Sequence, residues 1–238
     1  MPISRKSSRR IEETPLQPVE RPAPRPAVGL PRRIVIFVVI RDESGSMSPW
    51  RQRQGEFIPQ VAQHLKEVGG PRIGQLVYIL YCVISGDVVA TEFAPLDAAQ
   101  DPAFSPDGCT PLGRGFAAVA EGLESFLNNQ VFPQEVTPRN IELLVVSDLR
   151  PNGESAAETE SGVAKLLDVV KKYRAAVNVV GPDAASMNHA LAERLDVSGR
   201  GVKYLDSDPK AVLRITFDSL LSASRPAIGG PSRFSELG

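Results

Sequence analysis

Short apolar runs alternate with amphipathic segments along most of the chain. The runs consist mainly of apolar residues and are bounded by turn residues, which is typical of buried strands. A turn at Ser85-Gly86-Asp87 joins two of them and predicts an antiparallel hairpin. The predicted strands lie at 33–40, 75–84, 87–93, 141–147, 176–180 and 202–205.

The amphipathic segments between these runs predict helices. Their apolar residues recur at three- and four-residue spacing, as Leu112, Phe116, Val119 and Leu123 do. Because strands and helices alternate, the sequence predicts a single α/β domain with a mostly parallel sheet and one short antiparallel edge strand. The strands are apolar along their whole length, which favours helices on both faces of the sheet. The predicted helices lie at 57–68, 112–127, 163–170, 184–195 and 208–222.

Both ends of the chain lack this periodic pattern. Residues 1–32 contain seven prolines and many basic residues, and 224–238 has a similar character. Such stretches bury too little apolar surface to offset the entropy lost on ordering, so we expect two disordered tails. The region between them, 33–223, is expected to form one domain, as suits a chain of 238 residues.

The net charge of −1 is unevenly distributed. Residues 1–33 hold eight Lys or Arg and three Glu, a balance of +5, so the remainder carries −6. A domain with that charge lacks the basic character typical of nucleic-acid binding. We therefore expect no nucleic-acid partner for the domain.

The cysteines and the apolar run at 33–40 bear on the cellular compartment. Cys82 and Cys109 are too few for a disulfide framework or a four-cysteine zinc site, and they suit a reducing compartment. The run is far shorter than the ~20 residues of a membrane helix. Arg41 and Asp42 follow it, where a signal peptide would have small residues. We expect a cytoplasmic protein without a membrane segment.

Oxygen-bearing side chains occur at three places near predicted strand and helix ends. The first strand ends in "RDESGSM", where Asp42, Ser44 and Ser46 are spaced by two residues. Asp148 ends a later strand, and Thr110 lies in "GCTPLG", which opens a long helix. In an open α/β sheet, ligands bind beyond the carboxyl ends of the strands, where the strand order reverses. If these two strands are neighbours at that point, the five side chains converge.

The converging donors would be two carboxylates and three hydroxyls, without histidine or cysteine. Hard oxygen ligands of this kind select Mg²⁺, or else Mn²⁺ or Ca²⁺, over zinc. Two carboxylates neutralise a divalent cation, and five side chains leave a coordination position for water or a partner's oxygen. Gly45 lets the backbone bend around such an ion. Thr110 is also predicted to be the N-cap of the following helix, with Pro111 at its first position.

These segments resemble a known type of site. The quoted "DESGSM" and "GCTPLG" and the strand-ending aspartate look like the metal-ion-dependent adhesion site of von Willebrand factor A domains. The resemblance covers roughly 33–223 and implies a Rossmann-like fold. The metal-site residues that it implies are Asp42, Ser44, Ser46, Thr110 and Asp148.

A finer resemblance concerns "SGSM" together with "TPLG", which are similar to the bacterial TerY-like group associated with tellurium resistance and stress response. It implies a non-enzymatic adaptor in a multi-protein assembly, with a Glu or Asp of a protein partner completing the ion's coordination. Two positions depart from the family pattern. Arg41 stands where an apolar residue is more usual, and Leu149 replaces a small residue.

Three other interpretations of these motifs are open. A polar turn whose side chains bond to the backbone also explains the Asp-x-Ser-x-Ser spacing. "GRGFAA" at 113–118 imitates a dinucleotide fingerprint, but it does not directly follow a strand, and close helix packing explains its small residues better. A strand that ends in aspartate is also typical of aspartyl phosphotransferases, which usually carry a second acid where Ser44 stands.

The competing functional class is a metal-dependent phosphatase or other phosphoryl-transfer enzyme that uses Asp42 and Asp148. Such an enzyme needs cations that grip phosphate, for which Arg41, Arg114 and Arg150 are candidates. It also needs a general base, and both histidines lack partners at catalytic or metal-binding spacing. The sequence therefore favours the recognition module over the enzyme.

Overall fold

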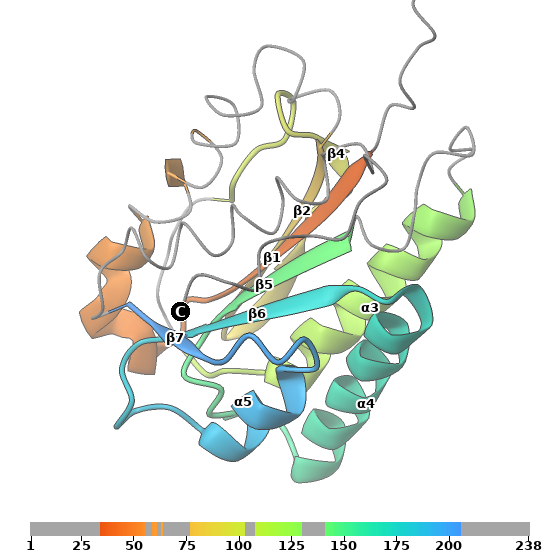
Figure 1. Ribbon diagram of the computed structural model, residues 1–238. Helices are drawn as coiled ribbons and strands as arrows, with labels where there is room; N and C mark the ends of the chain where they lie inside the picture. Colours follow the sequence, from red (N-terminus) through yellow and green to blue (C-terminus); the bar gives the residue numbers. More distant parts are fainter. Residues whose placement is uncertain are drawn as a thin grey trace, which may run out of the picture. The chain divides into compact units, whose positions relative to one another are not determined.

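A computed structural model describes residues 34–55, 59–60, 63, 77–102, 108–129 and 141–205. All of them belong to the compact unit Pro31–Gly238. The described strands form one seven-stranded sheet of order β3-β2-β1-β5-β6-β7, with β4 paired to β2 (Figure 1). The two predicted tails, and the predicted helix at 208–222, lie outside the described residues.

The strands confirm the predicted α/β class. The pairs from β2 across β1, β5 and β6 to β7 are parallel, whereas β3 and β4 both pair with β2 in the antiparallel sense. The strand bounds are β1 Val35–Asp42, β2 Val77–Ser85, β3 Asp87–Ala90, β4 Ala94–Pro95, β5 Ile141–Val146, β6 Ala176–Gly181 and β7 Lys203–Tyr204.

The second strand of the hairpin, predicted at 87–93, is shorter than expected. Its strand β3 ends at Ala90, and Thr91 then bonds Tyr81 twice: its N–H donates to the Tyr81 carbonyl at 2.8 Å, and its hydroxyl accepts from the Tyr81 N–H at 3.0 Å. Pairing with β2 resumes three residues later as β4. A threonine that bonds its partner strand through the side chain thus divides the edge.

The helices agree in order with the prediction and differ at their ends. The bounds are η1 Gly45–Trp50, a 3₁₀ helix, then α3 Leu112–Asn129, α4 Ala156–Tyr173 and α5 His189–Leu195. Residues 51–55 are also helical, and most of the predicted helix at 57–68 lies outside the described residues. None of the helices in the described part of the chain is long and apolar enough to cross a membrane.

The helix α5 starts later than the predicted 184–195. The Asp183 carboxylate accepts hydrogen bonds from the Ala185 and Ser186 N–H groups at 2.7 and 2.8 Å, which turns the chain before the helix. The Asn188 side chain then caps α5 by accepting from the Leu191 N–H at 3.3 Å. Aspartate and asparagine compete with helical bonding in this way at turns and caps.

The sheet is buried on both faces at its centre. Every residue of β1 is buried, with its side chains alternating between two apolar clusters. The first cluster contains Ile36, Val38 and Ile40 together with residues of α3, α4 and α5, which cover this face of the sheet (Figure 1). The second contains Val35, Phe37 and Val39, with Met47 and Leu96 among their neighbours. Burial on both sides explains why β1 is apolar along its whole length.

The strand order places a reversal between β1 and β5. From β1 the chain continues to β2 on one side, and the later strand β5 lies on the other side of β1. The carboxyl ends of β1 and β5 are therefore adjacent at the point where ligands bind in open α/β sheets. Convergence of the polar segments required these two strands to be neighbours, and they are.

Candidate metal centre

Asp42 is the last residue of β1, and its carboxylate is fixed at both oxygens. Oδ1 accepts the Ser44 N–H at 2.9 Å, and Oδ2 accepts the Ser147 hydroxyl at 2.6 Å. The residue is 0 % exposed. Two short bonds thus hold a buried carboxylate in one orientation at the end of the central strand.

The serines after Asp42 turn toward each other. The Oγ atoms of Ser44 and Ser46 lie 3.1 Å apart. Ser44 is buried, whereas Ser46 is exposed at the start of η1, so the site reaches the surface on the Ser46 side. Spacing by two residues therefore gathers these hydroxyls beside Asp42, as the sequence predicted.

The Thr110 loop is tied to both neighbouring loops through its backbone. The Gly108 carbonyl accepts from the Gly45 N–H at 3.3 Å, and the Thr110 carbonyl accepts from the Asn152 N–H at 3.0 Å. Gly108 has a φ of 72°, and a Cβ there would lie 2.8 Å from the Gly86 Cα, so only glycine fits. Thr110 is 3 % exposed, and these bonds hold its loop beside the loops that follow β1 and β5.

The predicted N-cap at Thr110 is wrong. The helix α3 begins at Leu112, and its first amides bond a carboxylate from another loop: Glu154 accepts from the Gly113 N–H at 2.7 Å and from the Arg114 N–H at 3.2 Å. A carboxylate at a helix N-terminus accepts hydrogen bonds from unpaired N–H groups and interacts favourably with the positive end of the helix dipole. Glu154 is distant in sequence, so no local pattern near Thr110 indicated it.

We expect Glu154→Ala to lower the free energy of unfolding by about 1 kcal/mol, because it leaves two α3 amides without their acceptor. Urea denaturation measures the change. Glu121→Ala is the matched control, since Glu121 lies on the same helix in an exposed ion pair with Lys165. Exposed pairs of this kind contribute little. Equal destabilisation by the two substitutions would remove the capping role.

Asp148 lies in a turn directly after β5 and is 2 % exposed. Its Oδ1 accepts the Arg150 N–H at 3.0 Å. The Ser147 hydroxyl, besides donating to Asp42, accepts the Leu149 N–H at 2.8 Å. Ser147 thus joins the Asp42 carboxylate to the turn that carries Asp148. The sequence prediction did not include it, because its role depends on the pairing of β1 with β5.

Electrostatics in this group favour a cation. Burial, with a smaller contribution from repulsion by Asp148, raises the pKa of Asp42 to about 6 against the lowering effect of hydrogen bonds from Ser147 and Ser44. A second carboxylate near a buried one destabilises the charged form of the buried group, here Asp42. A positive ion between them would offset both the repulsion and the loss of hydration.

The donor set fits a hard divalent cation. Across the described residues, no three or more His, Cys, Asp or Glu side chains gather in a way that could hold a metal ion. The group has two carboxylates with serine and threonine hydroxyls instead, and these oxygen donors are those that Mg²⁺, Mn²⁺ and Ca²⁺ prefer. The structure brings Asp42, Ser44, Ser46 and Asp148 close together, and Thr110 lies in a loop bonded to both neighbouring loops.

The arginines considered for phosphate binding are engaged elsewhere. Arg41 is buried, with ion pairs to Glu43 at 2.6 Å and Asp101 at 2.8 Å. Arg150 donates to the Ala185 carbonyl at 3.2 Å, and Arg114 lies 3.9 Å from an aspartate of β3. The ion pairs of Arg41 also explain why an arginine stands at position 41, where the family pattern has an apolar residue. The pair with Asp101 ties the end of β1 to the segment after β4.

The glycines of "GRGFAA" serve helix packing. A Cβ on Gly113 would lie 2.4 Å from the Glu158 carbonyl of α4, and one on Gly115 would lie 2.5 Å from the Ile84 side chain of β2. The small residues let α3 approach both elements closely. The structure supports this interpretation over the dinucleotide fingerprint.

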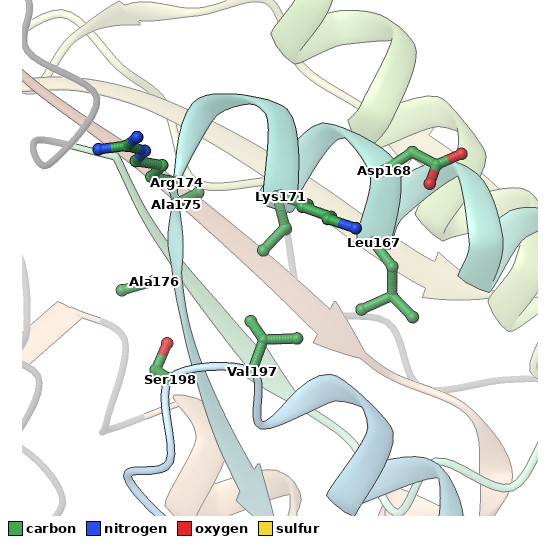
Figure 2. A pocket seen from close by; sticks show the side chains of 9 residues that line it. Leu167, Asp168, Lys171, Arg174, Ala175, Ala176, Val197 and Ser198 are labelled. Atoms are coloured by element: carbon green, nitrogen blue, oxygen red, sulfur yellow. The ribbon is translucent and has the colours of Figure 1, made fainter.

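A hollow of about 600 Å³ lies away from this group, beside the start of β6. Leu167 of α4 and Val197 of the loop after α5 lie on its two sides (Figure 2). Its cations Lys171 and Arg174 stand at the C-terminal end of α4, where the helix dipole favours positive charge. Helix stability thus explains these charges without a ligand.

Comparisons with known proteins agree with this architecture. No protein-family model and no curated protein matches the chain. Among solved structures, it resembles a von Willebrand factor type A protein from Catenulispora acidiphila (TM-score 0.55, 14% identity, 79% of this chain and 43% of that one). It also resembles manganese-loaded TRAP protein from Plasmodium vivax, with a TM-score of 0.54 and 14% identity over 79% of this chain and 74% of that one. A third is the pilus adhesin SpaC from Lactobacillus rhamnosus GG (0.54, 13%, 80% and 30%).

Identities this low establish the fold alone. The α/β sheet with its antiparallel edge, and the likeness to these structures, give the chain the fold of a von Willebrand factor type A domain. The chain spans less than half the length of the Catenulispora protein and of the pilus adhesin that it resembles.

Proposed function

We propose that this chain is a protein-recognition domain that uses a bound divalent cation to bind a carboxylate of its partner. The observation that carries the proposal is the buried Asp42 and Asp148 pair at the reversal of strand order, surrounded by hydroxyls. The residues that would hold the ion are Asp42, Ser44, Ser46, Thr110 and Asp148.

Mg²⁺ is the expected ion, with Mn²⁺ or Ca²⁺ as substitutes, because the donors are oxygens of carboxylates and hydroxyls. The ion would supply a Lewis-acidic position to which a Glu or Asp of the partner binds. Access is from the Ser46 side, where the site reaches the surface. Ser147 keeps the Asp42 carboxylate oriented toward this position through its 2.6 Å bond.

The solved structures of the same fold support a recognition role by analogy. SpaC is a pilus adhesin, and TRAP was crystallised loaded with manganese. We infer from the motif resemblance that the chain acts as a TerY-like cytoplasmic adaptor in a stress-response assembly. We favour this over a phosphoryl-transfer enzyme because Arg41, the cation next to Asp42, is taken up by Glu43 and Asp101.

Partner binding is expected to require both the cation and Thr110. The tagged protein should retain a partner from native lysate in Mg²⁺, lose it in EDTA and regain it when Mg²⁺ is restored. Thr110→Ala should weaken capture strongly while leaving stability nearly unchanged, because Glu154 bonds the α3 amides at this helix end.

The matched control for this test is Ser125→Ala, which removes a hydroxyl from an exposed position of α3. It should leave capture intact. A partner that stays bound in EDTA and to Thr110→Ala docks elsewhere on the domain, and the cation-dependent role would then be wrong.

A further inference from the structure

We propose that Asn188 is the positioning residue that holds Asp148 in its cation-binding orientation. The inference rests on the proposed metal centre and concerns how the fold builds it. Asn188 contacts the backbone of the Asp148 turn and, in this role, acts on the cation through Asp148.

Asn188 binds two consecutive carbonyls of that turn. Its backbone N–H donates to the Asp148 carbonyl at 2.9 Å, and its side-chain Nδ2 donates to the Leu149 carbonyl at 3.0 Å. Its Oδ1 meanwhile accepts the Leu191 N–H at 3.3 Å and caps α5. One residue thus connects the start of α5 to the peptides on both sides of the Leu149 Cα.

The turn needs such support because Leu149 has a φ of 57°. This left-handed conformation is disfavoured for a leucine and persists only where surrounding contacts impose it. It lets two adjacent side chains serve different purposes: Leu149 is 0 % exposed in the apolar cluster under the helices, while Asp148 joins the polar group. A relaxed φ at Leu149 would change the direction of one of them.

The helix α5 is itself anchored by the core. Leu191, Ala192 and Leu195 are buried in the same apolar cluster as Leu149. The position of α5 is therefore set by packing, and Asn188 transmits it to the Asp148 turn through two hydrogen bonds. Residues that orient a metal ligand in this indirect way commonly change affinity about 10- to 100-fold when replaced.

The test is Asn188→Ser in the full chain. Serine is a good N-cap, so α5 keeps an acceptor for its first amides, but serine has no amide to reach the Leu149 carbonyl. The substitution also leaves the net charge unchanged. We expect the Kd for Mn²⁺, measured by electron paramagnetic resonance of the free ion, to rise about tenfold.

The control is Asn129→Ser, the same change at an exposed position at the end of α3, which should leave the Kd unchanged. Thermal melts without metal check folding, and Asn188→Thr, with another capping residue, repeats the test if the serine variant folds poorly. A lower melting temperature with an unchanged Kd overturns the positioning role and leaves the metal centre standing. Absence of Mn²⁺ binding by the wild-type chain overturns the metal centre and this role with it.

Discussion

Asp42→Asn and Asp148→Asn are each expected to abolish the stabilisation of the domain by Mg²⁺ or Mn²⁺. A ligand that binds only the folded state adds about 2.7 kcal/mol at a hundred times its Kd. For a domain of this size, that corresponds to a rise in melting temperature of roughly 5–10 °C. Loss of either carboxylate leaves one negative charge for a divalent ion, so the rise should disappear in thermal melts with and without the ion.

Without metal, Asp42→Asn is not expected to destabilise the domain. Burial and repulsion from Asp148 raise the pKa of Asp42 to about 6, so its charged form is held at a cost at neutral pH. Asparagine removes the charge and keeps an oxygen for the Ser44 N–H, which donates to Asp42 at 2.9 Å. Its amide N–H can donate to the Ser147 hydroxyl oxygen in place of the bond that the carboxylate accepted from it. Asp42→Asn should therefore be at least as stable as the wild type in EDTA.

Asp168→Asn provides the control for both variants, because Asp168 is exposed on α4. It should retain the full metal-induced rise. A rise of wild-type size in both Asp42→Asn and Asp148→Asn would show that the ion stabilises the chain from another site.

The adjacency of the Asp42 and Asp148 segments in the candidate site could be predicted from sequence because it follows from general rules of sheet architecture. Continuous apolar runs identified β1 and β5, and Asp42 and Asp148 stand where those runs end. A parallel sheet with a reversal of order between the two strands then brings their ends together. The apolar runs that identify β1 and β5 also determine where these strands end in the sheet. The adjacency of Asp42 and Asp148 could therefore be predicted without knowledge of side-chain contacts.

The supporting residues could not be predicted in this way. Ser147 acts on a strand more than a hundred positions earlier, and Glu154 and Asn188 act across about forty positions each. Each is a common loop or cap residue by sequence, and its role appears only when the loops are assembled. The N-cap expected at Thr110 was wrong for this reason, because a local rule competed with a carboxylate supplied by the fold.

The close approach of α3 and α4 also depends on the assembled fold. A Cβ on Gly162 of α4 would lie 1.9 Å from the Gly113 carbonyl oxygen of α3. Gly113 is also one of the two α3 residues whose N–H groups Glu154 binds. The crossing of the two helices therefore lies next to the loop that carries Thr110, and it has no room for a methyl group.

Gly162→Ala is accordingly expected to destabilise the domain by about 1–3 kcal/mol or more, as overpacking does. A loss of stability would distinguish the two cases, because a change of glycine to alanine inside a helix otherwise raises the free energy of unfolding by up to about 1 kcal/mol. Gly122→Ala on α3 is the control: its Cβ would meet the flexible end of Leu80 at 3.3 Å, so we expect little change or a gain. Urea denaturation compares the two. A Gly162→Ala variant as stable as Gly122→Ala would mean that α3 and α4 do not cross closely at Gly113, which would remove this support for the Thr110 loop.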